Sequence, residues 1–468
     1  MKRPNLRNFI YLVGSGCIIQ LAGTFYRIWL AREIGPEGLG ILQMVYPVYR
    51  LLSGLATIGL PLALTKWTAE YIAAREYAEM LALKNWAVRN VLLTSCLAGM
   101  LLFWAAPFVS HRIFSDPRVG NALLIIAFAI PFSALSAIYR GYFQGFSAMA
   151  PTAASEIIEQ IAEVGCTVLG IIYLTALIPL PIFSYPVAGL TIGEVACLTT
   201  LLFFFKWKHP RYAAEKAEEA AGPSLVDTKS LKEPASPLPV LRYSWPLLLN
   251  QVVTSISFAS EGVIIPHLLI AAGYSAHLST GLFGKLTGMA EPVAYFPLIF
   301  LAPLGSVLSP QVSVAFKAKT LGKLRKKFAL YYIACAVICL ASFLLIFIGA
   351  NPLARLLYQD ASPVNLIRLL LFGLPFTGLA ILNINILMAV GATDKILMIS
   401  LWGTGLKTFA FFLFIPLFGI SGAAWAINIT QIFTLIASWV EVRRFLPWSG
   451  GLNCPRWLRP SRCRAELP

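Results

Sequence analysis

The sequence predicts an all-α membrane protein built from about twelve transmembrane helices. Of its 468 residues, 58% are hydrophobic and only 12% are charged, whereas soluble domains carry about 25% charged residues. This composition excludes an ordinary soluble enzyme, a disordered protein and a nucleic-acid-binding protein whose charge covers a folded surface. Because a membrane helix needs about 20 mostly apolar residues, we assign spans to twelve apolar runs: 8–31, 39–63, 88–110, 119–146, 151–177, 182–205, 242–270, 281–309, 328–349, 363–390, 393–415 and 418–441.

Positive charge is distributed unequally between the loops. With the N-terminus in the cytoplasm, 27 of the 37 lysines and arginines fall in inside segments and 4 fall in outside loops. Cytoplasmic loops carry such an excess, so we predict a multi-pass protein of the cell membrane with both termini in the cytoplasm. The first apolar run continues to Leu30, which favours a retained span over a cleaved signal peptide.

A polar segment divides the spans into two sets of six. Residues 208–240 contain five prolines and mixed charge, which is typical of a disordered cytoplasmic linker. We therefore predict an N-terminal six-helix lobe at 1–207, this linker, a C-terminal six-helix lobe at 241–445 and a basic cytoplasmic tail at 446–468.

Several residue pairs recur at a nearly constant spacing, which indicates that the two halves are repeats. The clearest are PFSAL at 131–135 with PFTGL at 375–379, and Gly40 with Gly284, both 244 residues apart. Six spans per half is an even number, so the repeat is parallel, about an axis along the membrane normal. In transporters with such repeats the substrate site lies between the halves, near the midplane.

Ionisable groups inside spans are expensive, and each is a functional hypothesis by default. Arg27 in the first span falls on Glu261 in the seventh at an offset of 234, and Glu163 falls on Lys407 at an offset of 244. We therefore expect one shared cavity in which opposite charges from the two halves balance. Its substrate-binding cations are Arg27, Arg50, Lys285 and Lys407; its acids, with ion coupling as a hypothesis, are Glu159, Glu163, Glu261 and Glu291; its polar face holds Gln20, Asn250, Thr254 and Ser257.

The alternative for each of these groups is that it snorkels to the membrane surface or pairs locally. We expect snorkelling for Arg140 and Arg368, which lie near span ends. The sequence shows no catalytic pattern and no cysteine or histidine cluster with metal-ligand spacing. It also lacks a phosphate-binding GxxxxGK[ST] loop, so we expect no enzyme activity, no metal and no cofactor. A coupling ion, Na+ or H+, stays unassigned.

Motifs spread along most of the chain resemble a known family. The sequence is similar to the stage V sporulation protein B and polysaccharide biosynthesis (oligosaccharide flippase) family of the multidrug/oligosaccharidyl-lipid/polysaccharide exporter superfamily. The resemblance runs from about residue 8 to about residue 440. It rests on GPEGLGILQM at 35–44, YPVY at 46–49, IGLPLALTK at 58–66, RGYFQG at 140–145, MAPTA at 149–153, Glu159-Gln160, LTGMA at 286–290 and GISGAA at 419–424.

The resemblance implies a V-shaped, two-lobed bundle that works by alternating access. It implies a flippase that moves an undecaprenyl-pyrophosphate-linked saccharide, a peptidoglycan or polysaccharide precursor, and a role in spore cortex synthesis. Cavity cations of the lipid II flippase match Arg27 by local context, and match Arg50 and Lys285 by span only. Two departures stand out: the family usually has fourteen spans rather than twelve, and it often has a cation near Glu163.

Two other functions remain open. The excess of acids and the twelve spans also fit a cation-coupled, multidrug-type exporter of small molecules. A membrane enzyme such as a saccharide polymerase usually places catalytic acids on large external loops, and here only Asp116 and Asp360 are candidates in short ones. The expected partners are membrane lipids and the lipid-linked saccharide, not nucleic acid, and we expect the protein to work as a monomer.

Overall fold

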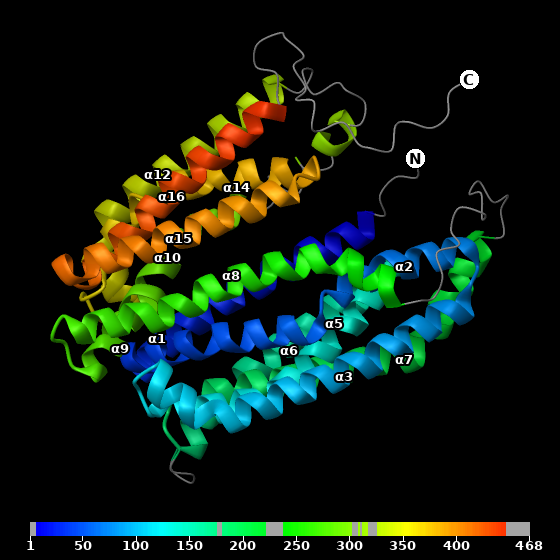
Figure 1. Cartoon of the computed structure of the whole chain (residues 1–468), viewed down its shortest axis with the longest axis horizontal. Coiled ribbons are helices and arrows are strands. Elements are labelled where there is room, and N and C mark those ends of the chain that lie inside the picture. Colours follow the sequence, from blue (N-terminus) through cyan, green and yellow to red (C-terminus); the bar gives the residue numbers. More distant parts are fainter. Residues whose placement is uncertain are drawn as a thin grey trace. The chain divides into compact units, whose positions relative to one another are not determined.

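The computed structural model describes residues 6–175, 180–220, 237–301, 308, 311–316 and 325–445. Within these ranges the chain is helical and contains no strand, as the composition predicts (Figure 1). The chain forms two compact units, Met1–Met289 and Ala290–Pro468. The boundary between the units therefore falls after α9 and not at the predicted 208–240 linker. Of that linker, 208–220 and 237–240 belong to helices, which corrects the predicted disorder there, and 221–236 lie outside the described residues. The division into two six-helix lobes stays a prediction, as does the basic tail at 446–468, which also lies outside them.

The first unit holds nine α-helices in the described part of the chain. They are α1 (Leu6–Thr57), α2 (Leu60–Ala74), α3 (Tyr77–Phe108), α4 (Arg118–Ala127), α5 (Ala129–Gly145), α6 (Met149–Leu169), α7 (Ser184–Ala220), α8 (Pro237–Ala271) and α9 (Ala276–Gly284). Short π-helical turns follow three of them: η1 (Val109–Ile113), η2 (Gly170–Leu174) and η4 (Lys285–Ala290).

The second unit begins with short elements and continues with long helices. Its elements are α10 (Glu291–Tyr295), the 3-10 helix η5 (Phe296–Leu301), α12 (Arg325–Tyr358), α13 (Val364–Leu371), α14 (Leu374–Ala389), α15 (Thr393–Phe418) and α16 (Ile420–Phe445). One part of its core packs Phe328 of α12 against Ile386 and Leu387 of α14 and Val442 of α16.

Eight described helices are long and apolar enough to cross a membrane, or up to ten if each bent pair counts as one span. The difference from the twelve predicted spans begins in α1, which has 52 residues and merges two of them. At about 1.5 Å per residue such a helix would far exceed the roughly 30 Å hydrocarbon core. Gly35, with φ 68°, breaks it, and Figure 1 shows the chain turning back there. The predicted span 281–309 is divided among short elements and partly lies outside the described residues.

Two spans are bent at equivalent places in the two halves of the sequence. Helices α4 and α5 meet at 41°, and α13 and α14 meet at 48°. Pro131 and Pro375, which the sequence pairs as repeat equivalents, lie at the start of α5 and α14. Proline has no N–H to donate and its ring clashes with the preceding turn. A proline at the equivalent position therefore bends each of the two spans.

Helices α1 and α9 approach so closely that glycine is required on both. A Cβ on Gly284 would lie 1.9 Å from the carbonyl oxygen of Pro36 and 2.6 Å from the backbone nitrogen of Gly40. A Cβ on Gly40 would lie 2.2 Å from the carbonyl oxygen of Thr280. The two glycines that the sequence pairs as repeat equivalents therefore face each other, and both contacts are with backbone atoms.

We expect Gly284→Ala to lower the free energy of unfolding by about 2 kcal/mol or more, because the backbone must separate to admit the methyl group. Gly165→Ala and Gly405→Ala are matched controls, since nothing lies within 4 Å of a Cβ at either position. In these controls alanine should be neutral or stabilise the helix. Denaturation of the purified protein in detergent measures all three variants, and equal stability of Gly284→Ala and the controls would contradict the close approach.

Candidate functional site

Helices α6 and α7 form the most extensive helix–helix contact between described elements of the first unit, and small residues explain it. Gly189 and Gly193 lie one turn apart on α7 and face α6. A Cβ on Gly189 would be 2.2 Å from the Thr167 hydroxyl, and one on Gly193 would be 3.0 Å from the Glu159 carbonyl oxygen. Small residues at this spacing let membrane helices pack at backbone distance. The stripe thereby fixes which α7 side chains meet the acidic face of α6.

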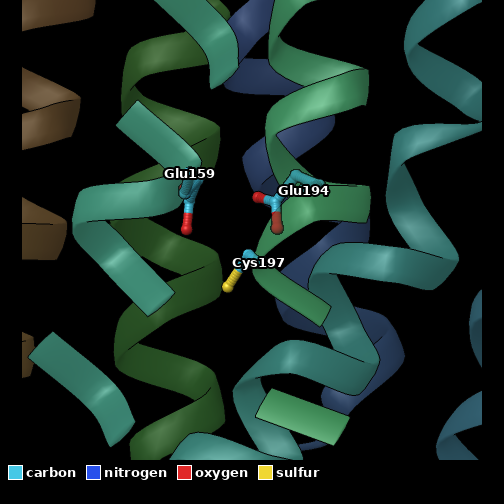
Figure 2. Close-up of side chains that lie close together, drawn as sticks. All are labelled: Glu159, Glu194 and Cys197. Atoms are coloured by element: carbon cyan, nitrogen blue, oxygen red, sulfur yellow. The ribbon is translucent and has the colours of Figure 1, made fainter. Parts of the chain in front are cut away.

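The packing brings three ionisable side chains together between these helices. Glu159 of α6 and Glu194 and Cys197 of α7 point toward one another, as Figure 2 shows. Arg140 of α5 forms an ion pair with Glu159 and donates a hydrogen bond to the Cys197 sulfur at 2.8 Å. The prediction that Arg140 snorkels is therefore wrong. We call these four residues the acid cluster.

Three side chains of the acid cluster, two carboxylates and a thiol, are of the types that bind metal ions. Ligand atoms of Glu159, Glu194 and Cys197 all lie within 4.8 Å of one another. The positive charge between them is already supplied, because the Arg140 guanidinium contacts both Glu159 and Cys197. A metal ion would have to displace that guanidinium, so the geometry fits a protein ion pair better than a metal centre.

Two tyrosines attach α1 to the same helix pair, one on each side of the Gly35 break. Tyr26 donates to the Thr167 hydroxyl at 3.0 Å, and Tyr49 donates to the Glu194 carboxylate. Both tyrosine side chains are buried. The two arms of α1 therefore contact α6 and α7 through one hydrogen bond each.

Arg27 and Arg50, the predicted cavity cations of α1, lie next to this arrangement and are exposed. The charge of Arg27 interacts with that of Glu163, which is half-buried on α6. Both arginines act electrostatically on Tyr46, which lies between them in sequence. Neither arginine has a carboxylate within ion-pair distance in the described part of the chain, so both guanidinium groups are available to an anion.

The other predicted cavity residues are distributed over both units. Thr254 is exposed, whereas Ser257 and Glu261 are buried on the same helix, α8. Lys285 and Glu291 are half-buried at the ends of η4 and α10. Lys407 is half-buried on α15 of the second unit, so the charge-swapped pairs stay a prediction. The side chains of Gln20 and Asn250 lie outside the described residues.

A groove of about 550 Å³ opens between the N-terminal arm of α1 and α6. Its walls are almost entirely apolar, with Gln160 as the one amide side chain among the lining residues. These are Ala22, Phe25, Tyr26, Trp29, Gln160, Ile161, Val164, Gly165 and Val168. Arg27 is not among them, so the groove and the α1 arginines present different surfaces.

A second charged group lies near the Gly35 break of α1, a turn of the chain that we predict to face outside. Arg118 donates to Glu37 at 2.7 Å and to Asp116 at 2.8 and 3.0 Å, and Thr280 donates to Asp116 at 3.1 Å. Burial of Asp116 raises the pKa of its carboxyl, but the hydrogen bonds and charge of Arg118 outweigh burial and hold that pKa below its ordinary value. Asp116 thus joins α4 to α9.

We expect Asp116 to stabilise the fold at neutral pH by about 1–3 kcal/mol through charge-assisted hydrogen bonds. Because the folded-state pKa lies below the unfolded value of about 3.9, this stability is present above pH 4 and is lost as the pH falls through the folded-state pKa. Thermal unfolding of wild type and Asp116→Asn between pH 3 and pH 7 measures it. The difference between the two should shrink toward pH 3. Asp394→Asn, an exposed control, should show a small difference throughout.

Sequence reasoning missed several residues of this site. Tyr26 and Tyr49 gave no signal, because an aromatic residue in an apolar run is typical of any buried helix face. The sequence analysis predicted snorkelling for Arg140 and gave Cys197 no role in the site. Arg140 and its partner Glu159 are only 19 residues apart in the sequence. The GxxxG spacing of Gly189 and Gly193 was a readable signal, and it would have placed α7 against α6.

The comparisons with known proteins agree with the fold. The polysaccharide biosynthesis protein family matches residues 5–316. The chain belongs to this family. It is 27% identical over 458 residues to stage V sporulation protein B of Bacillus subtilis (strain 168), covering 96% of this chain and 85% of that one. It is 22% identical over 339 residues to the lipid II flippase MurJ of the same organism, covering 68% and 59%.

The fold also matches solved structures. An inward-facing multidrug resistance MATE family transporter of the MOP superfamily superposes with a TM-score of 0.72 at 16% identity, covering 93% of this chain and 97% of that one. Identity this low supports the fold alone. Family, fold and apolar helices together make this chain a multi-pass membrane protein of the transporter superfamily that the sequence resembles.

Proposed function

We propose that the protein is a flippase that moves an undecaprenyl-pyrophosphate-linked saccharide across the cytoplasmic membrane by alternating access. The observation that carries the proposal is the pair of exposed arginines on the broken helix α1, Arg27 and Arg50, with no carboxylate at ion-pair distance among the described residues. Arginine forks bind phosphate oxygens in bidentate fashion. The similarity to stage V sporulation protein B and to the lipid II flippase supports the substrate class.

The neighbouring acids give the arginines a second role. Glu163 interacts with Arg27, so a pyrophosphate that binds Arg27 competes with a carboxylate on α6. A ligand shifts a conformational equilibrium only when it interacts differently with the two states. The anionic headgroup provides such a difference, because it replaces the Arg27–Glu163 attraction and frees α6 and the N-terminal arm of α1 to separate.

A transporter, and not an enzyme, is the function that these residues support. We further propose spore cortex precursor synthesis as the physiological role, because the similarity to stage V sporulation protein B extends over 96% of the chain. The proposed setting is the cell membrane with both termini in the cytoplasm, a monomer as the working unit, and Na+ or H+ as the coupling ion. Lys285 and Lys407 are proposed as further headgroup contacts.

The second candidate is a cation-coupled exporter of small molecules. The acids of α6 and α7 favour it: Glu159, Glu163 and Glu194 lie close together, and among the described residues Arg140 forms an ion pair with Glu159 only. In that case the acids would bind a cationic substrate or coupling ion, and Arg27 would serve to balance Glu163.

A reconstituted assay separates the two candidates. Purified protein in proteoliposomes is given a lipid-linked disaccharide precursor on one face, and the headgroup that reaches the other face is measured. The flippase proposal expects movement of this headgroup and no competition from a cationic dye such as ethidium. Dye efflux driven by a Na+ or H+ gradient, with no movement of the precursor, would instead support the exporter.

A further inference from the structure

Four aromatic side chains form a continuous group on the second unit, where α12 and α16 meet the break between α13 and α14. Phe343 and Phe347 of α12 stack with ring centroids 5.5 Å apart. Phe372, at the break, packs edge-on against both, at 5.5 and 6.1 Å. Trp425 of α16 stacks on Phe372 at 6.3 Å. We call these four residues the aromatic platform.

The break between α13 and α14 builds the platform. Pro375 cannot donate to the last turn of α13, and the two helices meet at 48°. Asn428 of α16 donates its side-chain N–H to the Leu369 carbonyl oxygen, in the last turn of α13, at 2.7 Å. This bond ties α16 to the break, and Trp425, one turn before Asn428, is thereby placed against Phe372.

The platform presents ring surface outward. Phe372 and Trp425 are each 43% exposed. Trp425 lies on a helix long and apolar enough to cross a membrane, and Phe372 lies at the break in the bent span formed by α13 and α14. Isolated exposed apolar residues need no explanation in a membrane protein. Phe372 stacks on Trp425 and stands edge-on to the stacked pair Phe343 and Phe347. The four rings therefore form a rigid, stepped apolar surface along which a chain can lie.

A positive charge sits at the edge of this surface. The guanidinium carbon of Arg368, in the last turn of α13, lies 5.5 Å from the ring centre of Phe347. Its Nε is buried and has no hydrogen-bond partner, and no carboxylate reaches ion-pair distance within the described ranges. An unsatisfied guanidinium N–H costs free energy inside a membrane protein. Interaction with the α13 helix dipole compensates only in part, and the guanidinium makes a cation–π contact with Phe347.

We propose that the aromatic platform and Arg368 bind a polyprenyl phosphate, with the phosphate on Arg368 and the isoprenoid chain along Phe372 and Trp425. The planar trisubstituted double bonds of an isoprenoid make it stiffer than a saturated acyl chain, which suits it to a rigid aromatic surface. A phosphate supplies charge-assisted acceptors for the terminal guanidinium nitrogens of Arg368, whose Nε is buried. This inference rests on the proposed flippase function and adds a lipid site to it. Because the 359–363 loop is predicted to be external, the site faces the outer half of the bilayer, where the flipped lipid or its carrier leaves.

Photolabelling tests the proposal. Full-length protein in phosphatidylcholine nanodiscs is irradiated with a diazirine-bearing undecaprenyl phosphate, and the labelled residues are mapped by mass spectrometry. We expect labels on the platform that unlabelled undecaprenyl phosphate removes and phosphatidylglycerol does not. Arg368→Gln should reduce labelling about tenfold through loss of a charge-assisted contact. Arg368→Lys should reduce it less, because it keeps the charge but not the fork.

Matched variants control for stability and for general lipid contact. Trp425→Leu should weaken labelling with Arg368 intact. Trp207→Leu should not, although Trp207 also stacks on a phenylalanine, Phe203, at 5.7 Å and is exposed. If Arg368→Gln fails to fold, Arg368→Lys and Trp425→Leu carry the test.

Three results would overturn the proposal: unchanged labelling in Arg368→Gln, equal labelling around Trp207, or equal competition by phosphatidylglycerol, which would make the platform a phospholipid site. The precursor translocation assay on wild type is run in parallel. Translocation without platform labelling defeats this inference alone, whereas absence of translocation defeats the proposed function.

Discussion

Replacing Arg27 or Arg50 with alanine is expected to lower precursor translocation by one to two orders of magnitude. Each guanidinium is exposed on α1 and has no carboxylate at ion-pair distance in the described part of the chain. A hydrogen bond to a charged group is worth about 1.5–3 kcal/mol, and each 1.4 kcal/mol is a factor of ten. Arg27→Lys and Arg50→Lys should recover part of the rate, because lysine keeps the charge but loses the bidentate fork.

The measurement is the initial rate of headgroup transfer in proteoliposomes, normalised to the amount of reconstituted protein. Arg355→Ala is the control, since Arg355 is also exposed but lies on α12 near its last turn. It should transport like wild type. Wild-type rates in both alanine variants of α1 would mean that these arginines only anchor the helix, and the pyrophosphate-binding role would be lost.

Breaking the Arg140–Glu159 pair is expected to destabilise the first unit by about 2–4 kcal/mol. Removing one partner of a buried ion pair leaves the other charge without compensation, which costs about 3–5 kcal/mol when burial is complete. Here the side chains are 25% and 27% exposed, so the loss is smaller. Arg140→Met should cost more than Glu159→Gln, because it leaves Glu159 close to Glu194 with no cation between them.

A double-mutant cycle isolates this interaction. The double variant Arg140→Met with Glu159→Gln should be more stable than the sum of the two single losses predicts, because no unpaired charge remains on either side of the pair. Glu70→Gln is the comparison, since Glu70 pairs with Lys66 one turn away on the surface of α2 and should cost less than about 1 kcal/mol. Additive losses in the cycle would show that Arg140 and Glu159 do not depend on each other.

The sequence predicted more of the secondary structure than of the site. Runs of about 20 apolar residues located the membrane helices. The repeat paired Pro131 with Pro375, and the structure places each of them just after a bend that the sequence did not predict. The span count differs where local chemistry is ambiguous. Gly35 separates two spans that the structure assigns to one helix, α1, and the segment after Gly284 forms short π and 3-10 turns in place of one regular span.

Only the tertiary structure decided the partners of the polar side chains. Tyr49 and Glu194 are 145 residues apart, and Tyr26 and Thr167 are 141 apart. No local pattern connects such residues. Their contact depends on how far each helix is rotated and on how closely α6 and α7 approach, which Gly189 and Gly193 permit. The prediction that Arg140 snorkels failed for the same reason, because its partner lies on a different helix.

The sequence by itself determined the helical membrane class, the positions of most spans and the family, because hydrophobic run length and the absence of backbone donors at proline are local properties of the chain. The tertiary structure alone decided which charges are paired and which are available. A guanidinium such as that of Arg140 is satisfied by a carboxylate from a neighbouring helix, whereas that of Arg27 stays exposed on α1. That distinction arises from helix packing, in which small residues set the distance and remote contacts set the rotation of each helix.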